Sequence, residues 1–564
     1  MPPAATNANI ARHLALMAAA HPVRAALKIP LGRTGSGDID YITLTFAELD
    51  DEVSSWCDRL SGAGIARGDR TLLMVRQGLP LIASAFALFR LGAVPVVIDP
   101  GMGLKNFLSC VARSRPTALV GIPLAQILSR LFRPTFSSVR HRVTASGSLT
   151  ARLSSNSRAS PRTTQSAAVA ADADLAAVLF TSGSTGSPKG VCYEHGMFDA
   201  QVRLIQKTYG IQPGEIDLPL LPVFALFNPA LGMTTIVPEI DPRRPAKVDP
   251  AKIVQAIRQE GVTNSFGSPT LWRKIGDHCI AEKISLPSLR RVLCAGAPVP
   301  AVLWKSSPIF LPNGELHSPY GATEALPVAS VSAREIDPAS TSGACVGRPI
   351  TGIDVRIIAL TDGPIATLAD TRELPRSEIG EIIARGSVVT KSYDALIVET
   401  AAAKISDPTK GAWTLANGSS APAGAVWHRL GDCGYFDADG RLWFSGRKVE
   451  RVETADAVLH TEPCEQVFRT HPRVTRCALI GFGERGRQRP AIVVEAHVSG
   501  SRAARQFARE LRLLARAHAH TTAIKLFYFH PKFPVDVRHN AKIHRLTLAH
   551  WALTARGYES DPKK

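Results

Sequence analysis

The sequence predicts an α/β protein, and two observations carry this prediction. Strand-like runs at residues 70–75 and 93–98 flank a helical pattern through 83–88, which is the order of a β-α-β unit. Two later runs, residues 262–269 and 291–298, each read as a strand that ends in Gly and Pro. Ligands of α/β sheets bind at such carboxyl ends of strands, so both ends are candidate binding positions.

Length and composition narrow the class of protein. The chain has 564 residues, more than one core ordinarily holds, so we expect about two to four domains. Its 45% hydrophobic and 20% charged residues are typical of a globular protein. The nine Cys form no C-x-x-C pair, which argues against a zinc ribbon or a disulfide scaffold. No secretory signal is recognisable, and the apolar region 78–99 is interrupted, so we expect a soluble, cytoplasmic protein.

The N-terminal third predicts further elements. Residues 9–28 read as an amphipathic helix. Phe46 opens a helix that runs to about Ala63, with Thr45 as its N-cap. Residues 144–172 are rich in Ser, Ala, Arg and Thr without periodicity, which predicts a surface loop.

Residues 179–190, LFTSGSTGSPKG, predict a phosphate-binding loop. The apolar run 176–180 is a short buried strand, and Gly and hydroxyl residues follow it at once. Glycines let the backbone N–H groups approach an anion, and Lys189 adds a point charge. The spacing differs from the G-x-x-x-x-G-K-[ST] loop, because Gly190 follows Lys189. A flexible polar linker is the alternative, which the preceding strand disfavours. The candidate residues are Thr181, Ser182, Gly183, Ser184, Thr185, Gly186 and Lys189.

An apolar pocket is also predicted. Residues 217–233 are apolar, broken by Pro and rich in Phe, so Phe224 and Phe227 either line a pocket for an acyl chain or pack in the core. Gly267 ends one of the two strands noted above and is a further pocket candidate. The other strand ends in Gly296, Ala297 and Pro298, which are candidates for nucleotide binding.

The spelling T-S-G-S-T-G-x-P-K-G is similar to the phosphate loop of the adenylate-forming superfamily, which contains acyl-CoA synthetases, luciferases and nonribosomal adenylation domains. The resemblance implies ATP and Mg²⁺, and conversion of a carboxylate to an acyl-adenylate with release of pyrophosphate. Residues 320–324 match its Y-G-x-T-E motif. The match implies that Tyr320 lies on the adenine face and that Gly321 is also a nucleotide-binding residue. It further implies that Thr323 contacts the α-phosphate and that Glu324 holds Mg²⁺ together with Thr185.

Three later motifs of the superfamily follow in order. Asp432 is the last residue of a match to the motif R-T-G-D, and Arg447 is the last residue of a match to the motif G-R. The two matches imply that Asp432 and Arg447 contact the ribose. Lys542 stands where the superfamily has its catalytic Lys. His539 is a candidate general base for a later step, and its alternative is a histidine of a turn.

The resemblance implies a large N-terminal adenylation domain of several subdomains at residues 1–446, including a small β subdomain around residues 380–386. A hinge at 447–450 and a small, mobile α+β lid domain at 451–564, which carries Lys542, would follow. The balance of charge changes at the same point: from Arg447 onward there are 22 Lys or Arg against 11 Asp or Glu, within a total net charge of +18.

Several stretches narrow the resemblance. FALFNPALG, FGSPTLWR, GRKVERVET and PVDVRHNAK look like the olefin β-lactone synthetases, which activate a 2-alkyl-3-hydroxy fatty acid and close it to a β-lactone. Val449 stands where ligases that make thioesters have a charged hinge residue, and no Gly-bearing loop follows it. A long-chain acyl-CoA or acyl-carrier ligase is the alternative activity. A non-catalytic adenylate-binding scaffold is the alternative of another class.

An arginine-rich helix predicted near the C-terminus is a candidate surface for binding a partner. Its arginines recur every three or four residues, which places them on one helical face. That face is either solvated or a docking surface for an acidic partner or a membrane. No aromatic residues interleave with this face, so we do not expect the protein to bind nucleic acid. The resemblance instead implies a complex with other enzymes of a hydrocarbon or lactone pathway. The arginines are Arg502, Arg505, Arg509, Arg512 and Arg516.

Overall fold

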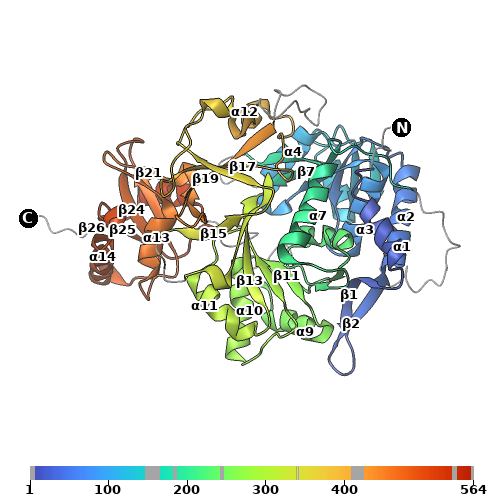
Figure 1. Cartoon of the computed structure of the whole chain (residues 1–564), viewed down its shortest axis with the longest axis horizontal. Helices are drawn as coiled ribbons and strands as arrows, with labels where there is room; N and C mark the ends of the chain where they lie inside the picture. Colours follow the sequence, from blue (N-terminus) through green and yellow to red (C-terminus); the bar gives the residue numbers. More distant parts are fainter. Residues whose placement is uncertain are drawn as a thin grey trace, which may run out of the picture.

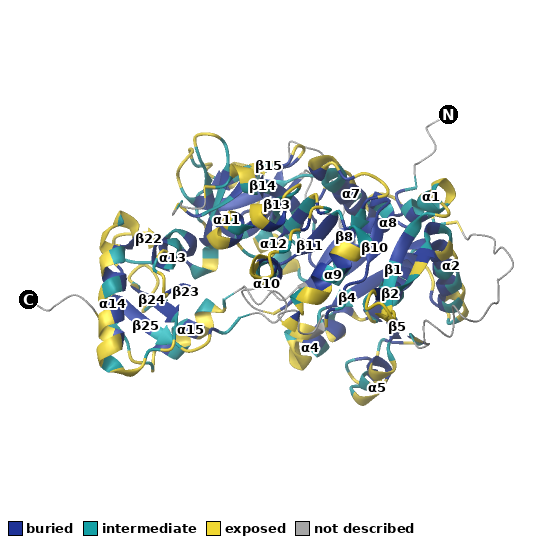
Figure 2. Cartoon of the chain, turned by 90° about the horizontal axis from the view of Figure 1, so that it is seen from below, coloured by how far each residue is buried: buried dark blue, intermediate teal, exposed yellow. Residues whose placement is uncertain are grey.

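The computed structural model of the chain describes residues 7–145, 166–181, 187–241, 247–337, 340, 342–407, 425–535 and 543–559. It confirms the predicted α/β class: two sheets with covering helices form the N-terminal part, and a further sheet lies among the C-terminal elements at one end of the molecule (Figure 1). The strands of these sheets are largely buried (Figure 2).

The first sheet contains the predicted β-α-β unit. Its strands β3 (Arg70–Met74) and β4 (Val94–Ile98) are parallel and α3 (Leu79–Leu91) connects them, as the hydrophobic pattern predicts. The other strands are also parallel except β8, which runs antiparallel to β7. The order across this sheet is β6 (His141–Thr144), β5 (Ala118–Gly121), β3 (Arg70–Met74), β4 (Val94–Ile98), β7 (Leu175–Thr181) and β8 (Lys189–Glu194).

The second sheet is longer and joins a parallel part to an antiparallel part. Strands β1, β10, β9, β11, β12 and β13 are parallel neighbours, whereas β13 to β15 and the strands beyond them pair antiparallel. The order is β16 (Asp354–Ile358), β17 (Gly380–Arg385), β19 (Ala425–Phe436), β20 (Leu442–Arg447), β15 (Ala344–Pro349), β14 (Ala325–Ser332), β13 (Glu315–Ala322), β12 (Arg291–Cys294), β11 (Asn264–Gly267), β9 (Ile216–Asp217), β10 (Thr234–Ile236), β1 (Ala25–Arg33) and β2 (Ile39–Thr45), with β18 (Lys404–Asp407) beside β19.

Helices cover these sheets, and their residues explain why they form. In α2 the predicted N-cap is confirmed: the Thr45 side chain accepts from the backbone N–H of Glu48, and the Glu48 carboxylate accepts from the backbone N–H of Thr45. The N-terminal helices are α1 (Arg12–Ala20), α2 (Phe46–Gly62), α3 (Leu79–Leu91), α4 (Leu104–Ser114), α5 (Pro123–Leu131), α7 (His195–Tyr209), α8 (Asn228–Leu231), α9 (Pro250–Glu260), α10 (Pro269–Ala281), α11 (Ala301–Phe310) and α12 (Ile397–Ala403).

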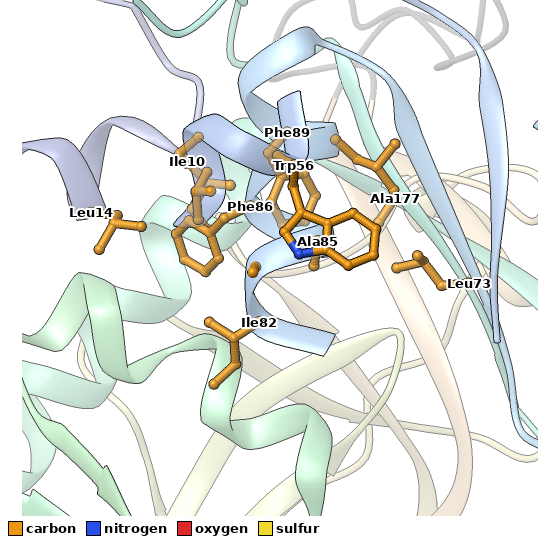
Figure 3. Packing of buried hydrophobic residues seen from close by; sticks show 14 of the residues in the cluster. Ile10, Leu14, Trp56, Leu73, Ile82, Ala85, Phe86, Phe89 and Ala177 are labelled. Carbon is orange, nitrogen blue, oxygen red and sulfur yellow. The ribbon is translucent and has the colours of Figure 1, made fainter. Parts of the chain in front are cut away.

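The core beside the first sheet is built by α2 and α3. Trp56 of α2 packs with Ile82, Phe86 and Phe89 of α3, and Ile10 closes the cluster from the N-terminal segment (Figure 3). Residues around the whole circumference of α3 are buried, so α3 is a core helix and not a surface helix.

The prediction of one helix over residues 9–28 is wrong in its second half. Helix α1 ends at Ala20, and the chain then enters β1, which pairs with β2 and β10. Strand β1 pairs with β2 on one edge and with β10 on the other, whereas a continued helix would leave those two strands without this partner. The predicted loop at 144–172 lies mostly outside the described residues.

The C-terminal elements combine helices with short sheets, as predicted. Their apolar clusters consist of residues from Val452 onward, with Phe468, Phe507 and Phe527 at the centre of the larger one. The boundaries proposed at residues 446 and 451 remain predictions. The elements are β21 (Val452–Glu453), β22 (Val458–Leu459), α13 (Thr461–Arg469), β23 (Cys477–Phe482), β24 (Arg489–Glu495), α14 (Gly500–Arg516), β25 (Leu526–His530), α15 (Arg545–Ala552) and β26 (Tyr558–Glu559).

The basic helix is α14, and one of its arginines leaves the predicted face. Arg512 is buried and donates to the backbone carbonyls of Thr522 (2.7 Å) and Ile524 (3.2 Å), so it closes the following turn. The other four arginines are exposed. Separately, none of the helices in the described ranges combines the length and the apolar character that crossing a bilayer requires.

Candidate active site

A cleft of ≈ 3620 Å³ runs between the sheets and reaches the C-terminal elements. Polar and charged side chains line one portion of it, and Phe side chains line another. Most of the site residues predicted from the sequence that the structure describes lie along this cleft.

Asp432, Tyr320 and Arg447 form one polar group in the cleft. Asp432 of β19 and Arg447 of β20 are cross-strand partners, and Arg447 Nη1 lies 2.8 Å from Asp432 Oδ1. The Tyr320 hydroxyl, from β13, donates to Asp432 Oδ2 at 2.7 Å. The Asp432 carboxylate raises the pKa of Arg447, so the guanidinium stays charged at neutral pH. Tyr320 and Asp432 are 112 positions apart in the sequence, and the sheet brings them together.

Thr323 and Glu324 occupy the turn between β13 and β14. The Tyr393 hydroxyl donates to Glu324 Oε1 at 2.8 Å, and the backbone N–H of Thr390 donates to the Glu324 carbonyl at 2.8 Å. The Tyr193 hydroxyl donates to the Thr323 carbonyl. Tyr393 was missed by sequence reasoning, because it lies about seventy residues from Glu324 and carries no pattern of its own.

Lys189 and Lys404 place two cations beside Tyr393. Lys189 opens β8 opposite Thr181, the last residue of β7, and its Nζ lies 4.8 Å from the centre of the Tyr393 ring. Lys404 is buried and donates to the carbonyl of Thr390 and, at 3.2 Å, to its hydroxyl. Burial lowers the pKa of Lys404 to about 7. Lys404 was also missed, since a lone Lys in a strand gives no signal in the sequence.

The remaining predicted residues of the phosphate loop and the lid lie outside the described residues: Ser182, Gly183, Ser184, Thr185, Gly186, His539 and Lys542. The residues that flank Lys542 are described. Val535 and Ile543 form a β-bridge and both line the cleft. Arg545, at the start of α15, donates to both oxygens of Glu465 and, at 2.9 Å, to Glu450.

The apolar portion of the cleft contains stacked rings. Phe224 stacks on Phe266 with 3.5 Å between ring centres, and Phe227 lies 6.3 Å from Phe224. Phe224 and Phe227 are pocket candidates from the sequence, whereas Phe266 was not singled out. Gly267 packs instead against Trp272, where an added Cβ would approach the indole ring to 2.9 Å. Gly296, Ala297 and Pro298 line the cleft after β12, and Gly321 does so at the end of β13.

His428 is a further cleft residue that sequence reasoning missed. It lies on β19, is buried, and its Nδ1 is 3.2 Å from the Ala403 carbonyl. Burial lowers its pKa well below the usual range of histidine, so the imidazole is neutral at pH 7. It sits beside the motif that ends in Asp432, but its neighbours in sequence give no sign of this environment.

The predicted hinge is attached on both of its sides. Lys448 donates to Glu381 of β17 at 2.9 Å, and Arg429 donates to both oxygens of the same carboxylate. On the other side, Glu450 accepts from Arg545. Val449 lies between these two charged residues and is 46% exposed. The absence of a charge at Val449 is therefore accompanied by ion pairs at both neighbours.

Comparison with known proteins agrees with this geometry. The family model described as AMP-binding enzyme matches residues 16–394. Olefin beta-lactone synthetases from Xanthomonas campestris pv. campestris and Stenotrophomonas maltophilia are each 42% identical, over 98% and 96% of this chain and 98% of each relative. The solved structure of an amide bond synthetase from Marinactinospora thermotolerans is 22% identical, with a TM-score of 0.74 over 97% of this chain and 99% of that one, a likeness that concerns the fold. The chain therefore belongs to the AMP-binding enzyme family.

Proposed function

We propose that this protein uses ATP to activate a 2-alkyl-3-hydroxy fatty acid as an acyl-adenylate and then closes it to a β-lactone, releasing AMP and pyrophosphate. The protein is thus an adenylate-forming ligase. One observation carries the proposal: a single cleft joins the Asp432–Arg447–Tyr320 group and Glu324 to the stacked rings of Phe224, Phe227 and Phe266. Such a cleft can hold a nucleotide and a long apolar acid at the same time. The full-length relatives named olefin beta-lactone synthetase support the same reaction.

The nucleotide end of the cleft follows from the side chains. An ionised carboxylate accepts hydrogen bonds from two neighbouring hydroxyls, so Asp432 suits a ribose, and Arg447 and Tyr320 fix its orientation. The Tyr320 ring offers a flat face to adenine. Lys189 supplies positive charge near the phosphates, where charge develops as pyrophosphate leaves.

The residues present fit Mg²⁺ bound through phosphates. Glu324 offers a carboxylate oxygen, the ligand type that Mg²⁺ prefers, and Tyr393 fixes its other end. Mg²⁺ in nucleotide sites is commonly held by one or two carboxylates together with the substrate phosphates. Mg²⁺ would neutralise phosphate charge during adenylation, with Glu324 as a protein ligand and Thr185 as a second candidate.

In the first step the substrate carboxylate oxygen attacks the α-phosphorus, and the bond to pyrophosphate breaks. Lys542 is the proposed cation for this transition state. In the second step the 3-hydroxyl oxygen attacks the acyl carbon, AMP leaves with the bonding pair, and the hydroxyl proton passes to a base. His539 remains the proposed base, and His428, whose imidazole is neutral, is an alternative candidate that lines the cleft.

A matched pair of acids tests the proposal. One acid carries the 2-alkyl group and the 3-hydroxyl, and its control lacks only the hydroxyl. We expect both acids to support exchange of pyrophosphate into ATP, while only the hydroxy acid gives sustained AMP release and a product lighter by one water. A hydroxy acid that forms adenylate but never loses water would overturn the lactone step, and absence of exchange with either acid would favour the scaffold alternative.

A further inference from the structure

Helix α5 presents an apolar face to solvent and a polar face to the protein. Leu124, Ile127 and Leu131 are 67%, 61% and 72% exposed and lie at positions i, i+3 and i+7, which is one helical face. The buried positions include Gln126 and Ser129, which bond to the carbonyls of Val143 and Gln126 respectively. This arrangement reverses the usual order of a surface helix, whose apolar stripe faces the core.

Helix α5 lies at the periphery of the molecule. Figure 2 shows α5 at the lower edge, far from α14 at the other end of the molecule. Strands β5 and β6 contact α5 on its inner side. An exposed row of large aliphatic side chains costs solubility, so its presence indicates a surface that contacts something else.

The charge around this face has one sign. Arg130 and Arg133 are exposed beside Leu131, and Arg140 and Arg142 are exposed at the neighbouring edge strand β6. From residue 100 to residue 171 the sequence contains ten Lys or Arg and no Asp or Glu. An apolar row flanked by cations and free of acidic neighbours in sequence is complementary to a layer of anionic headgroups above hydrocarbon.

The face is also continuous with the cleft. Ile122, Pro123 and Leu124, at the start of α5, line the cleft together with Met102 and Phe107. A lipid-like molecule that leaves a bilayer beneath α5 would therefore meet the cleft without crossing open water.

We propose that the outer face of α5, formed by Leu124, Ile127, Leu131, Arg130 and Arg133, docks the protein onto an anionic lipid surface. This surface is distinct from the basic face of α14, whose exposed arginines surround a single large aliphatic residue, Leu513. The proposal does not depend on the proposed function, because the face and its charge would act in the same way for any apolar substrate.

Sedimentation of the full-length protein with vesicles tests the proposal. The vesicles contain phosphatidylcholine alone or phosphatidylcholine with phosphatidylglycerol. We expect binding to the mixed vesicles that weakens with added salt, and little binding to phosphatidylcholine alone. Ile127→Asp and Leu131→Asp should each lower the partition coefficient by about tenfold or more, since each removes an aliphatic group that would enter the bilayer and adds a charge that anionic headgroups repel. Arg130→Glu and Arg133→Glu should each lower it by roughly fivefold or more.

Matched controls lie on α14. Leu513→Asp replaces a residue that is 68% exposed, and Arg509→Glu reverses an exposed charge, and both should leave the partition coefficient unchanged. All variants alter exposed side chains, and thermal melting by circular dichroism checks that each is folded. Deuterium exchange on vesicles provides a readout without any substitution: amides of residues 123–133 should gain protection, and those of 500–516 should not.

Three results would overturn the proposal. The wild type fails to bind the mixed vesicles; binding survives Ile127→Asp and Leu131→Asp but is lost with Arg509→Glu; or the α5 variants change the oligomeric state in size-exclusion chromatography while vesicle binding persists. The last result would assign the outer face of α5 to a second copy of the chain.

Discussion

Arg447 and Asp432 stand opposite each other on β20 and β19, with Arg447 Nη1 2.8 Å from Asp432 Oδ1. The Tyr320 hydroxyl holds the second carboxylate oxygen. Asp432 is 4% exposed, so its charge is both shielded from water and fixed in direction. A carboxylate held in this way is preorganised to receive hydroxyl donors without reorganising itself.

Asp432→Ala should therefore weaken ATP binding by about 2–3 kcal/mol, the cost of losing charged hydrogen bonds. Titration calorimetry measures the change directly. Tyr320→Phe is the matched control: it keeps the ring and removes one orienting bond, so we expect a loss of only about 0.5–1.5 kcal/mol. An ATP dissociation constant unchanged by Asp432→Ala would remove this residue from the nucleotide site.

Lys542→Ala should abolish adenylate formation while ATP still binds. A charge that acts mainly on the transition state affects turnover more than ground-state affinity. We expect the rate of pyrophosphate exchange to fall by roughly two to four orders of magnitude. Lys532→Ala, which alters an exposed Lys before the same segment, should leave the rate unchanged. Near-normal exchange by Lys542→Ala would contradict the assigned role.

Arg545→Met should destabilise the C-terminal elements. Arg545 donates to Glu465, which is fully buried, and to Glu450 at the predicted hinge. Removing one partner of a buried ion pair leaves uncompensated charge, which costs about 3–5 kcal/mol. Denaturant unfolding monitored on the C-terminal elements measures this loss.

Arg556→Met is the control for that variant, because Arg556 is exposed and should cost less than about 0.5 kcal/mol. Equal stability of the two variants would show that the Glu450–Arg545–Glu465 contacts do not hold the segment after Lys542 in place.

Lys404 gives the protein a stability that depends on pH. Burial lowers its pKa to about 7, whereas an unfolded Lys titrates near 10.5. Between these values the unfolded chain binds one proton more than the folded chain, so the free energy of unfolding rises with pH. Relative to Lys404→Met, the wild type should gain about 2 kcal/mol between pH 7 and pH 9. Chemical denaturation of both proteins at the two pH values provides the comparison, and parallel behaviour would show that Lys404 stays protonated in the fold.

Local patterns were sufficient where one stretch of chain determines its own structure. The Thr45 cap and the strands and helix of β3, α3 and β4 all follow from short-range signals, and the structure has them where predicted. The helix predicted over residues 9–28 failed from residue 21 onward. Residues 25–28 pair with β2 and β10 instead, and neither strand is visible in the local pattern.

The site shows the same division. Motif residues such as Tyr320, Glu324 and Asp432 could be named from the sequence, and most of those that the structure describes line the cleft. Tyr393 and Lys404 could not, because their importance arises from what lies beside them after folding. Arg512 is assigned to the exposed basic face from its helical spacing, and this assignment is wrong. Its side chain is buried because it donates to two backbone carbonyls that follow the helix.

The central claim is that ring closure needs no external thiol. The segment from Arg447 to Glu450 is held by Glu381 on one side and by Arg545 on the other, and it carries no charge at Val449. An internal hydroxyl held in the cleft reacts at an effective concentration of up to about 10⁵ M, less whatever the strain of a four-membered ring removes.

A competition experiment tests this claim most directly. The protein receives ATP, Mg²⁺, a 2-alkyl-3-hydroxy acid and an excess of coenzyme A, and both products are quantified by mass. The account predicts β-lactone as the main product, at a rate that coenzyme A does not change. Acyl-CoA as the main product, with lactone only in traces, would contradict it and establish the acyl-CoA ligase alternative.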